Sequence, residues 1–174
     1  MKMTTFLRCA VLALAGFSAW AAHAQAPQRP ASAFSANVPA EWFQLALLLT
    51  QQTPGFSPPV AARAFGYMGL TLYESVLPGM PQNTSLAGQL NELQSLPPAQ
   101  PDEPLHWPTV ANASMATMTR MMFPNASAEN KTRIDLLERN LPLKYPQEFD
   151  ATAVTAEITQ RSQSFGKLMA MALM

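Results

Sequence analysis

Prolines divide this chain into short apolar segments, and this division constrains its fold more than any other feature. All 16 prolines follow the first 24 residues and make up about one residue in nine there, against a usual frequency of about 5%. Proline lacks the backbone N–H that helix interiors and central strands need, so it marks boundaries. Between these boundaries apolar residues recur at helical spacing, and no stretch alternates with a period of two. The sequence therefore predicts an all-α array or bundle of about five to six helices with no strands.

The expected helix boundaries follow from the prolines and from capping residues. Ser57 is an N-cap, and Pro58 occupies the first helical position, where no N–H is needed. Ser127 caps a later helix that we expect to end before Pro142. The expected helices cover 39–53, 58–77, 108–123, 128–141 and 152–174, with room for a short one over 86–93. The proline-rich segment 80–107 is predicted to be a long, mostly irregular surface connection.

The second expected helix carries the clearest core-facing stripe. Its apolar residues recur at steps of four, three, four and four: Ala61, Phe65, Met68, Leu72 and Val76. Gly66 and Gly69 lie in the same helix, where each glycine costs about 1 kcal/mol of helix propensity. We expect close approach by another helix at these glycines to offset that cost.

The first 24 residues have the layout of a secretory signal peptide. Lys2 and Arg8 give a positive start, residues 9–20 are almost entirely apolar, and residues 22–24 read Ala-His-Ala, a small-x-small cleavage site. The apolar run is too short to span a bilayer, which takes roughly 20 residues. We therefore expect an exported protein, periplasmic or secreted, with no membrane anchor after cleavage. The predicted organisation is a signal peptide over 1–24, a mobile Pro/Ala/Ser tail over 25–37 and a helical domain over 38–174.

The composition of the exported part limits its chemistry. The predicted signal peptide contains the single cysteine, Cys9, and one of the two histidines. The remainder therefore has no disulfide, and His106 alone cannot build a multi-histidine metal site. The whole chain has 11 basic and 11 acidic residues and no basic stripe, which disfavours a nucleic-acid binder. The glycine-rich loops of dinucleotide and P-loop enzymes are also absent from the sequence.

The last expected helix has no stop signal. Residues 165–174 are mostly apolar and remain in helical phase, with no proline or polar turn to close them. Such an end would leave apolar surface exposed. We therefore expect either a chain that continues into a missing C-terminal half or a homo-oligomer formed through this helix.

Four segments, in order, resemble the N-terminal helical region of bacterial vanadium-dependent haloperoxidases, which are relatives of the type 2 phosphatidic acid phosphatases. The segments are SPPVAARAFGYMGLTLYESVLPGMP (57–81), SLAGQLNEL (85–93), HWPTVANASMATMTRMMFP (106–124) and SFGKLMAMAL (164–173). The resemblance implies an all-α bundle around a vanadate or phosphate site. In the family, this oxyanion is held by a lysine, two arginines, a Ser-Gly-His segment and a second histidine, all further along the chain.

None of those catalytic motifs occurs in this sequence. A highly charged oxyanion needs several converging cations, and a histidine must act as its apical ligand or as the nucleophile. We therefore expect no catalytic residue and no cofactor in this chain, which would be the N-terminal part of a haloperoxidase- or acid phosphatase-like protein and inactive alone. The missing half would carry the catalytic motifs. The alternative is a stand-alone periplasmic helical module that binds a partner protein.

One candidate metal site consists of thioethers. Met115, Met118 and Met121 follow one another at steps of three, so they lie near each other on a helix. Soft sulfur ligands at this spacing could bind Cu(I) in an exported protein. Methionine also fills irregular gaps in hydrophobic cores, and we favour this second interpretation.

Two further groups of polar residues have structural and functional interpretations. Arg63 and Glu74 share one face of the second expected helix, where they could bear on a distant active site; we favour a structural ion pair or a hydrogen-bonded cap with other helices. Asp102, Glu103 and His106 could form a metal or acid–base cluster. Because prolines surround them, we expect a solvated loop instead.

Overall fold

The computed structural model describes residues 28–150 and 154–174, which form helices and connections with no strand. The α-helices are α1 (Asn37–Gln52), α2 (Pro58–Val76), α3 (Trp107–Met122), α4 (Ala128–Lys144) and α5 (Ala156–Ala172). Short 3-10 helices, Ala31–Ala33 and Leu77–Gly79, precede α1 and follow α2. The all-α prediction is confirmed. The predicted signal peptide, 1–24, and Thr152, the expected start of the last helix, lie outside the described residues.

Helix starts fall close to the predicted caps. Ser57 occupies the N-cap position of α2 in an extended conformation, with Pro58 in the first helical position, but its side chain forms no capping hydrogen bond. The side chain of Ser127 precedes α4 and accepts the N–H of Asn130 at 3.2 Å, which satisfies one of the free donors of the first turn. The side chain of Thr155 does the same for Ile158 at the start of α5, at 3.2 Å.

Two expectations about helix extent are wrong. The helix predicted to end before Pro142 continues to Lys144. The short helix expected over 86–93 is absent, because this segment forms turns. Gly88 and Glu92 there have φ values of 77° and 67°, outside the right-handed helical region.

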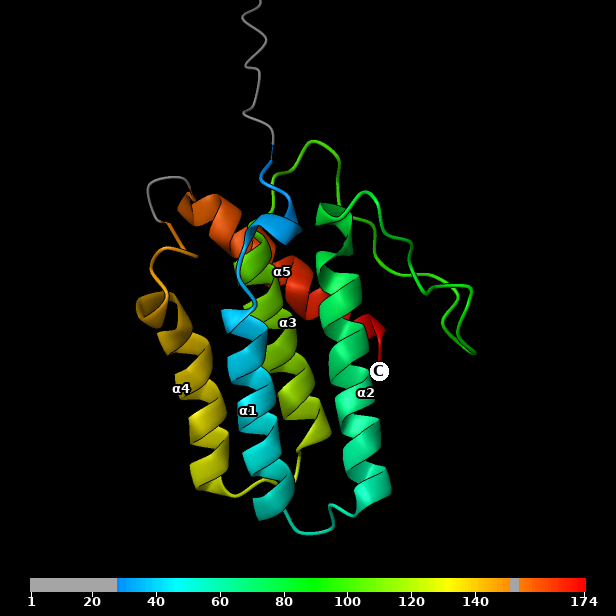
Figure 1. Ribbon diagram of the computed structural model, residues 1–174, viewed down its shortest axis with the longest axis vertical. Helices are drawn as coiled ribbons and strands as arrows, with labels where there is room; N and C mark the ends of the chain where they lie inside the picture. The colour runs from blue at the N-terminus through cyan, green and yellow to red at the C-terminus, as the bar shows by residue number, and fades with distance from the viewer. Residues whose placement is uncertain (1–27, 151–153) are drawn as a thin grey trace, which may run out of the picture.

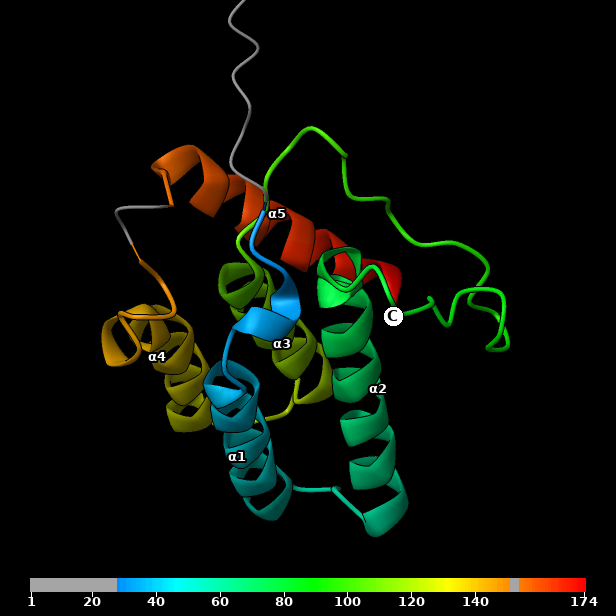
Figure 2. The ribbon, with the colours of Figure 1, turned by 45° about the horizontal axis from the view of Figure 1, so that its top comes forward.

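Helix α3 is the central element of the array. Twelve of its 16 residues are buried, and it packs against each of the other four α-helices. Figure 1 shows α1, α2, α3 and α4 running alongside one another, and Figure 2 shows α5 crossing them near one end. Small residues make this position possible, since α3 contains Ala, Ser and Thr along most of its length.

The close approach between helices occurs at Gly166 rather than at the glycines of α2. A Cβ on Gly166 would lie 2.5 Å from the carbonyl oxygen of Val110 and 3.0 Å from the backbone nitrogen of Ser114. Only glycine therefore lets α5 cross α3 at this distance. Gly66 and Gly69 have no atom within 4 Å of the equivalent position, so the expectation of helix contact there is wrong.

The hydrophobic core lies between α1, α2, α3 and α4, with a smaller cluster where α5 covers α3. The side chains of the main cluster are almost completely buried; the largest are Trp42, Phe123, Leu49, Met68, Met115, Met118, Ile134 and Leu141. The smaller cluster contains Leu105, Trp107, Val110, Phe165 and Met169. Of the stripe predicted on α2, Met68 is buried in the main cluster, and Phe65, Leu72 and Val76 pack against that cluster while partly buried; Ala61 belongs to neither cluster.

The segment before α1 packs against the body of the protein. Trp107 donates its indole N–H to the carbonyl of Arg29 at 3.0 Å, and the backbone N–H of Ser35 donates to Glu148 at 3.3 Å. Phe34 contacts the ring of His106 edge-on, with centroids 5.4 Å apart. The tail expected over 25–37 therefore differs from the prediction in its described part, because these aromatic and hydrogen-bonded contacts fasten it to α3 and to the segment after α4.

The long proline-rich connection leaves the end of α2 and extends beyond it before returning to α3 (Figure 1). Its first turn is fastened by hydrogen bonds to Glu74 of α2. Of the helices that the structure describes, none combines the length and the apolar character that crossing a bilayer requires.

Candidate functional site

A cleft of about 340 Å³ opens between α3, α4 and α5. Residues from all three helices and from the segment that follows α4 line it: His106, Thr109, Asn112, Ala113, Glu138, Arg139, Pro142, Phe149, Val154, Thr159, Gln163 and Lys167. The lining combines apolar side chains with charged and amide groups. It is therefore a candidate ligand site in the described part of the chain.

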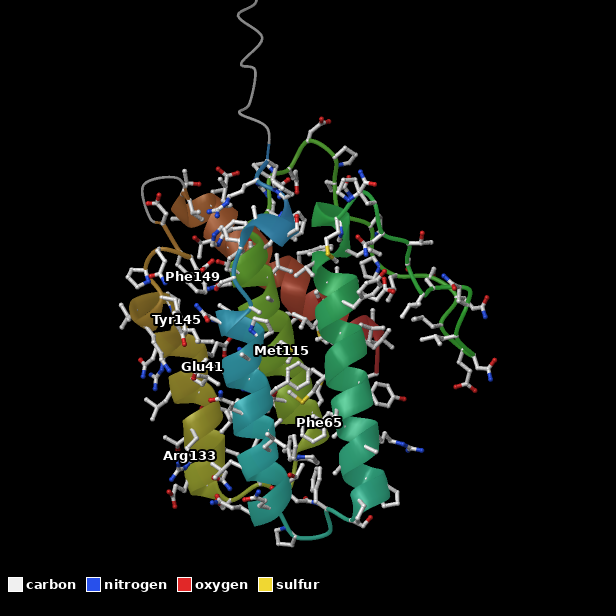
Figure 3. The ribbon with its side chains drawn as sticks, viewed as in Figure 1. Glu41, Phe65, Met115, Arg133, Tyr145 and Phe149 are labelled. Carbon is white, nitrogen blue, oxygen red and sulfur yellow. The ribbon has the colours of Figure 1, made fainter. Side chains whose placement is uncertain are left out.

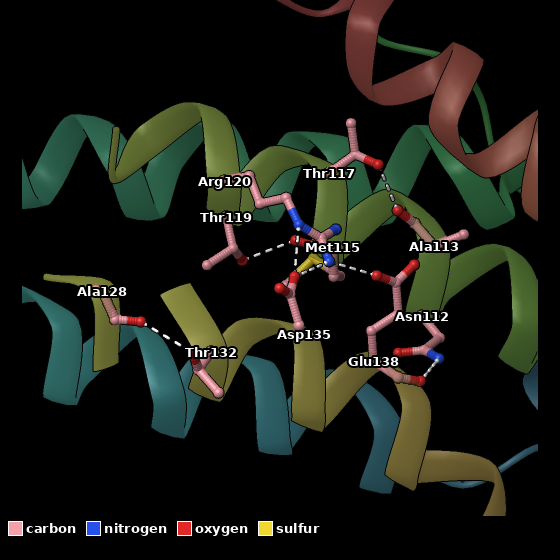
Figure 4. A network of polar contacts seen from close by, with 10 residues as sticks. All are labelled: Asn112, Ala113, Met115, Thr117, Thr119, Arg120, Ala128, Thr132, Asp135 and Glu138. Atoms are coloured by element: carbon pink, nitrogen blue, oxygen red, sulfur yellow. Dashed lines mark hydrogen bonds and ion pairs between the residues drawn. The ribbon is translucent and has the colours of Figure 1, made fainter. Parts of the chain in front are cut away.

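The charged groups of the cleft are mainly positive. Arg139 on α4 and Lys167 on α5 are exposed at its lining, and neither forms an ion pair with another described residue. Among the described residues that line the cleft, Glu138 is the only acidic one, and its carboxylate pairs with Arg120 at 2.5 Å. Arg120 also pairs with Asp135 at 2.7 Å (Figure 4). Arg120, outside the cleft, thus shares its single positive charge between Glu138 and Asp135.

Asn112 joins three helices beside the cleft. Its side-chain oxygen accepts the indole N–H of Trp42 on α1 at 2.9 Å, and its side-chain nitrogen donates to the backbone carbonyl of Glu138 on α4 at 2.8 Å (Figure 4). The carbonyl of Glu138 is free for this bond because the residue four positions later is Pro142, which has no N–H. Asn112 therefore satisfies the carbonyl that the proline leaves open.

His106 lies in the inner part of the cleft, at the N-cap of α3. It is 7% exposed, and its Nδ1 lies 2.8 Å from the hydroxyl oxygen of Thr109. Its ring also hydrogen-bonds to the backbone of Glu148, and its backbone N–H donates to Ser162 at 2.8 Å. Phe149 contacts the ring with centroids 5.7 Å apart. The expectation of a solvated loop is therefore wrong for His106, because it begins a buried helix.

Burial sets the protonation of this histidine. Desolvation lowers the pKa of His106 below its usual 6.5, although the hydrogen bond to the backbone of Glu148 opposes this change. The ring is therefore neutral near pH 7. A neutral ring with these hydrogen bonds fixes the start of α3 against the segment after α4.

The other members of the expected acidic cluster lie apart from this arrangement. Asp102 and Glu103 are exposed, and Glu103 pairs with Arg161 at 3.3 Å. The described residues contain no group of three or more His, Cys, Asp or Glu side chains that could hold a metal ion. The sequence thus placed His106 near Asp102 and Glu103, whereas the fold directs it toward Thr109, Glu148 and Phe149.

Glu74 has a clear structural role, and Arg63 does not join it. The carboxyl group of Glu74 is almost completely buried and accepts the hydroxyl of Ser85 at 2.9 Å and the N–H of Leu86 at 2.7 Å. It therefore anchors the start of the long connection rather than another helix. Arg63 is exposed and forms no ion pair among the residues that the structure describes.

The three methionines of the copper hypothesis have different environments. Met115 and Met118 are completely buried in the main core cluster, whereas Met121 is half-buried. Burial among apolar side chains is the environment of a gap-filling methionine. Cu(I) binding at this set stays a prediction, and no feature of the fold favours it.

A salt bridge connects the N-terminal part of α1 to the C-terminal end of α4. Glu41 on α1 accepts hydrogen bonds from Lys144 and Tyr145, both at 2.6 Å. The hydrogen bond from Lys144, followed by that from Tyr145, lowers the pKa of Glu41. Figure 3 shows Glu41 and Tyr145 near one another between α1 and the end of α4 that lies closer to Phe149.

The outward face of α5 carries exposed apolar side chains. Leu168 and Met171 are 47% and 57% exposed, and Met174, just after the helix, is 58% exposed. The opposite face of the same helix is buried through Phe165, Gly166 and Met169. The C-terminal end of α5 thus exposes two large apolar side chains, Leu168 and Met171, whereas the earlier part of the same outward face carries polar and charged residues.

No family model, curated protein or solved structure matches this chain. The cleft residues Thr109, Arg139, Gln163 and Lys167 were not singled out by the sequence, because they belong to three helices with no shared motif. The only local signal was the polar character of these positions on otherwise amphipathic helices.

Proposed function

We propose that this chain is the non-catalytic N-terminal helical part of an exported protein related to vanadium-dependent haloperoxidases and type 2 phosphatidic acid phosphatases. The ordered resemblance of four segments supports this proposal, as does the all-α array. In such a protein, vanadate or phosphate would be held by a second, catalytic half. The helices described here would form the scaffold against which that half packs.

The environment of His106 carries the non-catalytic part of the proposal. An apical ligand or nucleophile must present a free ring nitrogen to the oxyanion. The ring of His106 is instead buried between Phe34 and Phe149 and hydrogen-bonded to Thr109 and to the backbone of Glu148. His106 therefore acts as a structural residue at the start of α3.

The outward face of α5 supports the scaffold role. Leu168, Met171 and Met174 would together leave an apolar strip in water unless another element covers it. A helix of the catalytic half would cover this strip in the proposed protein. The alternative, a stand-alone module, would use the same strip to bind a helix of a separate partner or of a second copy.

The first experiment reads the coding sequence that follows Met174 and expresses any downstream segment together with this chain. We expect the segment to contain Ser-Gly-His and to co-purify with the chain. Leu168→Glu and Met171→Glu should abolish co-purification. Leu143→Glu is the matched control, because Leu143 is 79% exposed on α4 and not on α5.

The outcomes separate the two functions. A downstream segment without an oxyanion motif would overturn the proposed relationship. Light scattering of the chain alone then distinguishes the alternatives. A dimer that Met171→Glu dissociates would indicate self-association through α5, and a monomer unaffected by this change would favour a separate partner protein.

A further inference from the structure

The cleft between α3, α4 and α5 has no role in the scaffold proposed above, and its chemistry points to a ligand of its own. We propose that it binds a small amphipathic organic anion. The hydrocarbon part would lie against Ala113, Pro142 and Phe149, and the carboxylate would lie between Arg139 and Lys167. The inference does not depend on the relationship to haloperoxidases.

The size of the cleft suits a small ligand. Its volume of about 340 Å³ lies near the lower end of the range of about 300–1,000 Å³ usual for small-molecule sites. Three elements form its walls, so a bound molecule would contact protein on several sides. A medium-chain carboxylic acid has the appropriate size and shape.

The charges of the cleft favour an anion. Arg139 and Lys167 come from different helices and line the same cleft, with no ion pair to another described residue. The guanidinium of Arg139 can bind a carboxylate through two parallel hydrogen bonds, and Lys167 adds a second positive charge. The negative charge of Glu138 is already paired with Arg120, so it opposes an incoming anion less.

The inner polar groups of the cleft are already satisfied by the protein. Asn112 is engaged by Trp42 and by the carbonyl of Glu138, and His106 and Thr109 bond to one another. Because these groups already have hydrogen-bond partners, they would form few new hydrogen bonds with an inorganic oxyanion that carries several charges. The apolar lining gains from contact with hydrocarbon instead. Satisfied polar groups beside an apolar lining favour an amphipathic monoanion over phosphate.

The test uses isothermal titration calorimetry of the full chain at neutral pH. Octanoate is the probe, and inorganic phosphate, acetate and octylammonium are the comparison ligands. We expect saturable binding of one octanoate per chain. Phosphate, acetate and octylammonium should each bind at least about tenfold more weakly, because each lacks the hydrocarbon or the negative carboxylate.

Substitutions place the binding in the cleft. Arg139→Gln and Lys167→Gln should each weaken octanoate binding by about tenfold, which corresponds to the loss of one charge-assisted hydrogen-bonded contact. Arg133→Gln is the matched control, because Arg133 lies on the same helix toward the end away from Phe149 (Figure 3) and does not line the cleft. Thermal unfolding of each variant confirms that it is folded.

Three results would overturn the proposal. One is the absence of saturable octanoate binding by the folded chain. Another is equal binding of octylammonium or phosphate. The third is binding that Leu168→Glu abolishes and Arg139→Gln leaves unchanged, because it would place octanoate on the exposed strip of α5. None of these results depends on whether a catalytic half exists.

Discussion

The side-chain N–H of Asn112 donates to the backbone carbonyl of Glu138 across 2.8 Å, and so replaces the helical donor that Pro142 lacks. A residue of α3 thereby completes the hydrogen bonding of α4. The same amide accepts the indole N–H of Trp42, so α1 joins the arrangement. This contact explains how α4 continues through a proline that would otherwise end it.

We predict that Asn112→Ala lowers the free energy of unfolding by about 2 kcal/mol, because the buried indole N–H of Trp42 and the partly buried carbonyl of Glu138 lose their partner. Pro142→Ala should reduce this cost by about 1 kcal/mol, since the new N–H of residue 142 can bond to Glu138. A double-mutant cycle measured by urea denaturation checks the coupling. Equal costs of Asn112→Ala in both backgrounds would show that the proline and the asparagine act independently.

Gly166 should tolerate alanine much less well than the glycines of α2. Gly166→Ala places a Cβ 2.5 Å from the carbonyl oxygen of Val110, and such overpacking costs about 1–3 kcal/mol of stability. Gly66→Ala is the matched control, because its Cβ meets nothing within 4 Å. That substitution should stabilise the protein by about 0.5–1 kcal/mol through helix propensity. Both values can be measured by urea denaturation, and similar effects at the two sites would contradict the close crossing of α5 over α3.

His106 should make the stability fall in mild acid. Burial lowers its pKa below the ordinary value of 6.5, so the unfolded chain binds the proton more readily than the folded chain does. The stability that neutral His106 contributes to the folded chain is fully present above pH 6.5. It is lost progressively as the pH falls from 6.5 toward the lower pKa that His106 has in the folded chain. Urea denaturation at several pH values measures this slope.

A substitution of His106 is the direct control for this pH dependence of stability. In His106→Asn the dependence between neutral pH and mild acid should become smaller, whatever the absolute stability of the variant. Glu41 affects stability at lower pH. Because its pKa is lowered in the folded chain, the stability that ionised Glu41 contributes is lost only as the pH falls below the ordinary carboxyl pKa of 4.5. An unchanged slope in the asparagine variant would assign the acid sensitivity to other groups.

Glu74 should control the order of the long connection. Glu74→Gln replaces one of the two accepting oxygens by a donor, so the N–H of Leu86 or the hydroxyl of Ser85 loses its partner. We expect a loss of about 1–3 kcal/mol in stability and faster proteolysis within the connection. Glu129→Gln serves as the control, because its carboxyl group is exposed on α4. Proteolysis at equal rates in the two variants would rule out the anchoring role.

The sequence predicted the features of the fold that depend on local chemistry. Ser57 with Pro58, and Ser127 with Asn130, mark helix starts because these signals need only neighbouring residues, although only Ser127 accepts a capping hydrogen bond through its side chain. Pro142 misled the prediction because its compensation comes from Asn112 on another helix. Gly66 and Gly166 look alike in sequence, and only the crossing of α5 over α3 distinguishes them.

The candidate site was less predictable than the fold. Arg139 and Lys167 are separated along the chain and belong to no common motif, so their shared cleft depends on how α4 and α5 dock on α3. His106 was expected in a solvated loop because prolines surround it in the sequence. Its burial follows from the contacts that Phe34 and Phe149 make with its ring, and these come from distant segments.

A turnover assay of the purified chain tests the scaffold proposal most directly. The chain would be incubated with vanadate, hydrogen peroxide and bromide, and separately with a phosphate ester, alone and together with any downstream segment. We predict no turnover above the protein-free reaction for the chain alone, and turnover when a segment bearing Ser-Gly-His is present. Turnover by the chain alone would contradict the proposal that these helices are a non-catalytic scaffold.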